Sequence, residues 1–61
     1  MTKEEAAGKL RDLMYEIELE TIKSEYKIRT IKSLDAFHKQ NGYLTAPQQD
    51  LLENIYTEVI G

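Results

Sequence analysis

Residues 9–41 contain neither glycine nor proline, and this long run without a helix breaker constrains the fold more than any other feature. Seven residues in the run alternate at steps of four and three, which is the spacing of the buried side of a coiled-coil helix. They are Leu10, Met14, Ile17, Thr21, Ser24, Ile28 and Ile31. Thr2 and Glu5 form the capping-box pattern that begins a helix. The sequence therefore predicts one long helix from about residue 3 to about residue 40.

A second apolar series lies on another side of the same predicted helix. It consists of Tyr15, Leu19, Ile22 and Tyr26, and two apolar stripes on one helix indicate more than one neighbour. The first stripe weakens at Thr21 and Ser24, so an alternative stays open in which the helix breaks or kinks near residues 21–24 and the chain forms three helices. The β-branched residues of this segment lower helix propensity by only about a few tenths of a kcal/mol each. We therefore favour the continuous helix.

A short C-terminal helix is predicted from about residue 46 to about residue 59. Asn41-Gly42 supplies the pair that ends a helix, because glycine adopts the left-handed conformation without strain. Thr45 and Gln48 then form a second capping box. Apolar residues recur beyond it at helical spacing, and they are Leu51, Leu52, Ile55, Tyr56, Val59 and Ile60. The short connection makes the two predicted helices antiparallel neighbours.

The two predicted helices form one all-α domain spanning residues 1–61, a helical hairpin. The C-terminal helix is expected to cover Ile31, Leu34 and Phe37 in the second half of the long helix. The first half then lacks an intrachain partner, and an apolar stripe of that size is rarely left in water. We therefore expect a homodimeric bundle or a larger protein partner. In the three-helix alternative, the first half closes on its own chain.

The small size of the chain also favours a partner. A domain of 61 residues buries only about 60% of the surface that its unfolded chain exposes. The sequence has no cysteine, so disulfides and thiolate metal sites cannot stabilise it. The N-terminal residues lack the apolar core of a signal peptide, and no run reaches the ~18 apolar residues of a membrane helix. We expect a cytoplasmic protein without membrane contact.

No group of residues has the spacing that catalysis or metal binding requires. His38 is the only histidine, and the Glu-x-x-His pattern of carboxylate-bridged metal sites is missing. The carboxylates Glu16 and Glu20 have helical spacing, as acidic residues on solvated helix faces commonly do. A glycine-rich phosphate loop is also missing. The sequence predicts a protein that is not an enzyme, with no metal, no cofactor and no small-molecule substrate.

The predicted partner or dimer interface combines the two apolar stripes of the uncovered first half. Its eight residues are Leu10, Leu13, Met14, Tyr15, Ile17, Leu19, Ile22 and Tyr26. Tyrosine is enriched at interfaces because its ring is apolar while its hydroxyl group tolerates water. A protein partner is therefore the first hypothesis for function.

Residues 23–39 form the only basic segment, with five lysines and arginines against two acids. Arg29, Lys32 and Lys39 lie on one side of the predicted helix and could contact phosphates, which would give salt-sensitive binding to nucleic acid. The segments on either side carry net negative charge and would repel a duplex. Nucleic-acid binding is therefore the second hypothesis, and a solvated face of salt bridges remains open as well.

The stretch "FHKQNGYLTAPQQDLLENIY", residues 37–56, resembles a pattern in small phage proteins and phage DNA-processing enzymes. It is similar to the small helical module associated with the recombination helicase UvsW of T4-like phages. The positions that carry the resemblance are Gly42, Leu44, Thr45 and Gln48. The resemblance implies attachment to DNA repair or recombination machinery. We therefore expect a small phage or mobile-element protein, located in the host-cell cytoplasm if the chain is phage-encoded, that acts as an accessory factor or inhibitor. The alternative is an accessory protein of recombination or repair that binds DNA or RNA through residues 23–39.

Overall fold

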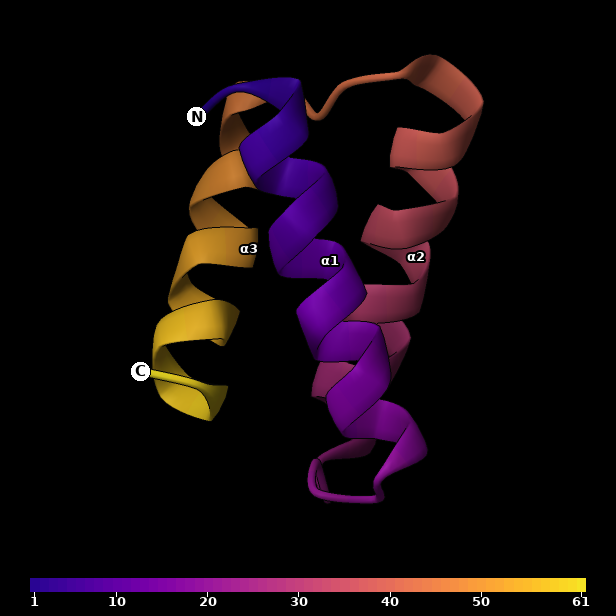
Figure 1. Ribbon diagram of the computed structural model, residues 1–61, viewed down its shortest axis with the longest axis vertical. Coiled ribbons are helices and arrows are strands. Elements are labelled where there is room, and N and C mark those ends of the chain that lie inside the picture. Colours follow the sequence, from indigo (N-terminus) through magenta and orange to yellow (C-terminus); the bar gives the residue numbers. More distant parts are fainter.

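The structure, a computed structural model, describes residues 1–61 and contains three α-helices and no strand. They are α1 (Lys3–Glu18), α2 (Glu25–Asn41) and α3 (Ala46–Val59). Consecutive helices run in opposite directions, and α1 lies between the observer and the other two in Figure 1. The all-α prediction is confirmed, as are the start of the first helix and both bounds of the last one.

The predicted continuous helix over residues 3–40 is wrong, because α1 ends at Glu18. The backbone N–H of Thr21 donates to the carbonyl of Glu16 at 3.1 Å, and that of Glu20 donates to Ile17 at 3.0 Å. This pair of bonds is the Schellman arrangement, which requires a left-handed residue one position after the cap. Glu20 takes that position with φ 59°, so the chain turns without a glycine.

The helix α2 begins immediately after this turn, with Ser24 as its N-cap. The Ser24 hydroxyl accepts a hydrogen bond from the Lys27 backbone N–H at 3.3 Å, which satisfies one free amide of the first turn. Between the two helix ends, Ile22 is buried, with 7% of its surface exposed. The polar positions that weaken the predicted apolar stripe are therefore parts of a connection between helices, as the three-helix alternative predicts.

The core consists of nine buried residues, all apolar, contributed by the three helices and both connections. They are Ala6, Leu10, Leu13, Ile22, Ile31, Leu34, Leu44, Leu52 and Ile55. Since Leu10 and Leu13 pack inside this cluster, the first half of the chain has an intrachain partner. The helical hairpin with an uncovered N-terminal half is therefore wrong, and the structural reason for expecting a homodimer disappears with it.

The corner between α2 and α3 has the predicted local structure. Gly42 has φ 78°, and its N–H donates to the His38 carbonyl at 2.7 Å. Thr45 and Gln48 exchange both hydrogen bonds of a capping box. The rings of Phe37 and Tyr43 pack edge to face with centroids 5.9 Å apart, and this contact fixes the direction in which α3 begins.

The N-terminus of α1 is held by the predicted capping box between Thr2 and Glu5. The Thr2 backbone N–H donates to the Glu5 carboxylate at 3.0 Å, and this bond lowers the pKa of Glu5. A carboxyl group with a lowered pKa stabilises the fold when it is ionised. The contribution of this cap is therefore present at neutral pH and is lost as the pH falls through the lowered pKa.

Polar contacts connect α3 to both other helices at the rim of the core. Lys9 of α1 pairs with Glu53 of α3, and its ammonium lies 5.0 Å from the centre of the Tyr56 ring. Lys27 of α2 pairs with Glu58 of α3 at 2.7 Å. The glutamates of these pairs are exposed and the lysines are half-buried. Ion pairs at a protein surface contribute little to stability, so the apolar cluster holds the bundle together.

Replacement of Glu20 by glycine is expected to stabilise the protein by about 0.5–1 kcal/mol. A left-handed residue with a side chain costs about 1–2 kcal/mol, and the greater freedom of glycine in the unfolded chain offsets part of the gain. Urea unfolding followed by circular dichroism measures the change. Glu18→Gly, inside the last turn of α1, is the control and should destabilise by about 1 kcal/mol. Destabilisation by Glu20→Gly as well would contradict the turn at this position.

Candidate protein-binding surface

Three of the eight residues predicted to form an interface lie in the core. Leu10, Leu13 and Ile22 are buried, so they offer no surface to a second molecule in this fold. Met14 and Ile17 are half-buried and pack against the same cluster. The prediction is corrected for the three buried residues, because the turn after α1 lets the chain cover its own first half.

The other three predicted interface residues are exposed. Tyr15 exposes 57% of its surface, Leu19 54% and Tyr26 68%. Leucine is among the residues most often buried and tyrosine is intermediate, and the structure also exposes Met1, Tyr43 and Ile60. Exposure after the core has closed therefore makes the three predicted residues the remaining candidates for a binding surface.

Tyr15 of α1 and Leu19, the C-cap of that helix, are neighbours because they are four residues apart. The Leu19 backbone N–H donates to the Tyr15 carbonyl at 3.0 Å, so helical geometry extends through Leu19 and stacks the two side chains on one side of the helix. Tyr15 follows the buried Leu13 by two residues, which is a rotation of about 200° around the helix. Burial of Leu13 thus turns Tyr15 and Leu19 away from the core.

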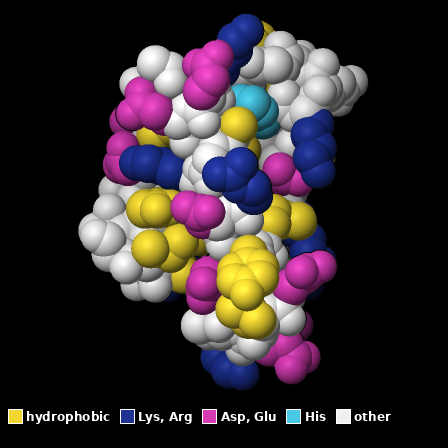
Figure 2. Space-filling model, in the orientation of Figure 1, with side chains coloured by type: hydrophobic (Ala, Val, Ile, Leu, Met, Phe, Trp, Pro, Cys, Tyr) yellow, Lys and Arg dark blue, Asp and Glu magenta, His cyan; other side chains and the backbone are white.

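Beside Tyr15 the surface has a shallow depression with a volume of about 290 Å³. Its other lining residues are Arg11, Met14 and Glu18, all from α1. We define the α1 patch as Tyr15 and Leu19 together with this depression. Figure 2 shows hydrophobic side chains gathered over the lower half of α1, with acidic side chains on both sides of them.

Tyr26 does not join the α1 patch. It lines a groove between α2 and α3 with residues of both helices, namely Arg29, Thr30, Ser33, Leu34, Gln48 and Leu51. The stripe that a continuous helix would have formed from Tyr15 to Tyr26 is therefore divided between two faces of the bundle. This division could not be read from the sequence, because it depends on the turn at residues 19–24.

The three predicted nucleic-acid contacts all lie exposed on α2. Two of them already have acidic neighbours on the same helix: Arg29 lies 3.7 Å from Glu25, and Lys39 lies 3.0 Å from Asp35. Lys32 has no ion pair within 4.0 Å. The basic side of α2 is thus largely the solvated face of salt bridges that the sequence left open.

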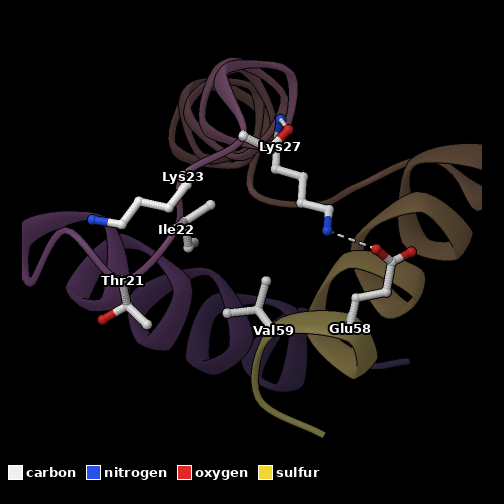
Figure 3. A pocket seen from close by; sticks show the side chains of 7 residues that line it. Thr21, Ile22, Lys23, Lys27, Glu58 and Val59 are labelled. Atoms are coloured by element: carbon white, nitrogen blue, oxygen red, sulfur yellow. Dashed lines mark hydrogen bonds and ion pairs between the residues drawn. The ribbon is translucent and has the colours of Figure 1, made fainter.

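A further cavity, of about 320 Å³, lies between the turn at residues 21–24 and the end of α3. Figure 3 shows the Lys27 ammonium directed at the Glu58 carboxylate, while Lys23 extends away from this pair. Ile22 and Val59 form its apolar side. Of the two lysines that line the cavity, Lys27 is neutralised by Glu58, whereas Lys23 has no ion pair within 4.0 Å.

His38 lines a cleft of about 400 Å³ between α1 and α2. Its Nε2 lies 3.2 Å from the carbonyl oxygen of Lys3, so the ring bridges the end of α2 to the start of α1. No group of three or more histidine, cysteine or acidic side chains could hold a metal ion. None of the helices combines the length and the apolar character needed to cross a bilayer. The Lys3 carbonyl is thus the polar partner that the structure gives to the His38 ring.

Comparisons with known proteins add no residue or role to this description. No model of a protein family, no curated protein and no solved structure matches the chain. The α1 patch and the cations of α2 are therefore the features from which a function can be inferred.

Proposed function

We propose that this chain is a non-catalytic binding protein that captures another protein through the α1 patch. The observation that carries the proposal is the exposure of two adjacent large apolar side chains, Tyr15 and Leu19, on a bundle whose core is otherwise closed. Neither side chain belongs to the buried core cluster. Their types are therefore better explained by a contact outside the chain than by folding.

The chemistry of the patch supports a protein as the ligand. A tyrosine ring offers a rigid apolar surface with one polar tip, and tyrosine is enriched at the centres of protein interfaces. Leu19 extends this apolar surface beside the ring. The depression lined by Arg11, Met14 and Glu18 can receive a side chain of the partner next to the ring. A cavity of this size is too small and too open to enclose a typical small ligand.

The resemblance of residues 37–56 to the phage helicase-associated module supports a partner among nucleic-acid-processing proteins. In this proposal the chain is a phage or mobile-element accessory factor or inhibitor that occupies a surface of such a machine. The positions that carry the resemblance, Gly42, Leu44, Thr45 and Gln48, form the corner and the start of α3. They would position the bundle without contacting the partner themselves.

We expect Tyr15→Ser combined with Leu19→Ser to weaken partner binding at least about tenfold, which corresponds to about 1.4 kcal/mol. The affinity-tagged protein is used to isolate bound proteins from the cells that express it, after nuclease treatment. The dissociation constant of each captured and purified partner is then measured by calorimetry. Loss of two apolar anchors removes the contact area that excludes water from the interface.

The matched control is Tyr26→Ser combined with Ile60→Ser, which also removes one exposed tyrosine and one exposed aliphatic side chain. Capture should survive in this control, and both double variants should keep the circular dichroism spectrum of the wild type. A partner that binds the Tyr15/Leu19 variant as tightly as the wild type would contradict the proposal.

Nucleic-acid binding is the second candidate, favoured by the exposed and unpaired Lys32. The same experiment separates the two functions. Retention through nucleic acid is abolished by nuclease, falls steeply with added salt, and is lost with charge reversal of Arg29, Lys32 and Lys39. Retention through the α1 patch survives nuclease.

A further inference from the structure

We infer that the α1 patch takes a basic, amphipathic segment of a different protein, an inference that rests on the proposed function and names the chemistry of its partner. The residues around the patch are strongly unbalanced in charge. Four acids lie on or just after the second half of α1, and they are Asp12, Glu16, Glu18 and Glu20. Arg11 is the only base among residues 11–20.

These four carboxylates have no ion pair, and of the seven other acids in the protein only Glu4, Glu5 and Asp50 also have none. Glu25, Asp35, Glu53 and Glu58 each have a lysine or arginine partner within 4.0 Å. None of the four around the patch has such a partner, and Asp12 accepts only one long hydrogen bond, from the Tyr56 hydroxyl at 3.4 Å. The negative charge that surrounds Tyr15 and Leu19 is thus uncompensated within the chain.

A partner that covers the patch removes water from the acidic side chains at its border, so the charge of the partner determines whether binding is favourable. A neutral or acidic partner would desolvate these carboxylates without replacing their hydrogen bonds to water, which is unfavourable. Lysine and arginine side chains form charge-assisted bonds to them instead. Their long aliphatic stems also extend the apolar contact over Tyr15 and Leu19.

A second copy of this chain does not fit the same surface. In a two-fold contact each residue meets the same surface of its partner, so the acids of one copy would face the acids of the other. The two Arg11 side chains cannot neutralise both sets. Like charges across an interface oppose association, and this excludes the homodimer through the α1 patch in favour of a basic segment from another protein.

The inference is tested with two synthetic helical peptides that share the same leucine face. One carries lysine at every polar position and the other glutamate. Each is titrated into the isotopically labelled protein, and the backbone amide shifts are followed by NMR. The lysine peptide should give saturable shifts centred on residues 11–20, and the glutamate peptide should bind at least about tenfold more weakly. Added salt should weaken the binding of the lysine peptide.

Charge reversal at the patch, Glu18→Lys with Glu20→Lys, should weaken the binding of the lysine peptide at least about tenfold. It should also reduce the dependence of this binding on salt concentration. The matched control is Glu4→Lys with Asp50→Lys, which changes the net charge by the same amount. Both positions are exposed and lie in the N-terminal halves of α1 and α3, away from the patch. This control should stay within about twofold of the wild type. Both variants avoid residues that form ion pairs.

Three results would overturn the inference. They are equal affinity for the two peptides, amide shifts outside the patch, and an equal loss of affinity in the two charge-reversal variants, which would mean that only net charge matters. Self-association that depends on Tyr15 and Leu19, seen by analytical ultracentrifugation, would replace the basic partner with a second copy. A native partner that needs Tyr15 and Leu19 but tolerates Glu18→Lys with Glu20→Lys would leave the proposed function standing and remove this inference alone.

Discussion

Leu13→Ala is expected to destabilise the protein by about 2–5 kcal/mol, the range for removing a leucine side chain from a closed core. Leu13 is completely buried in the structure, among core residues from all three helices. A chain of 61 residues has a total stability of about 3–9 kcal/mol at typical values per residue. The variant should therefore lose a large fraction of the free energy of unfolding, as measured by urea unfolding at constant temperature.

Two controls make this result specific to the three-helix bundle. Leu13→Met keeps most of the volume and should cost less than about 1.5 kcal/mol. The unfolding midpoint of the wild type should also be independent of protein concentration, because Leu13 is covered by its own chain. A midpoint that rises with concentration would instead place Leu13 in an interface between two copies.

Ile22→Ala is expected to destabilise the protein by about 2–3 kcal/mol, whereas Leu19→Ala should change stability by less than about 0.5 kcal/mol. In a continuous helix these two residues would belong to the same stripe and respond alike. The turn at residues 19–24 separates them, so that Ile22 packs in the core while Leu19 lies in solvent. The comparison holds the chemistry of the substitution nearly constant and varies only burial.

Thermal and urea unfolding of both variants measure the difference, and Tyr26→Ala, another exposed member of the same stripe, serves as a second reference. Similar losses of stability in Ile22→Ala and Leu19→Ala would contradict the position of the turn. A small effect of Leu19→Ala has a second use, because it shows that the loss of binding proposed for the Tyr15 and Leu19 variant is not caused by unfolding.

The sequence by itself determined the helix ends that depend on near neighbours. The capping boxes at Thr2 and Thr45 and the glycine stop at Gly42 are all confirmed. Each is a set of hydrogen bonds between residues no more than a few positions apart, so the residue types and spacing carry the information. The same holds for α3, whose bounds follow from its cap and its apolar spacing.

The turn after α1 could not be assigned with the same certainty, and its residues explain why. The left-handed position holds Glu20 rather than glycine, and the N-cap Ser24 is followed three residues later by lysine rather than glutamate or glutamine. Helical spacing continues across both positions. Locally, therefore, a turn and a continuous helix are close in free energy, and the sequence pattern favours the helix.

Only the tertiary structure decided between a turn and a continuous helix after Glu18, and the same choice determined the candidate site. Turning back lets Leu10 and Leu13 bury against α2 and α3, which gains more free energy than the strained residue costs. The same turn sends Ile22 inward and leaves Tyr15 and Leu19 outside. Burial is a property of contacts between distant segments. The sequence could name the apolar residues, but the return of the chain determined which of them remain available to a partner.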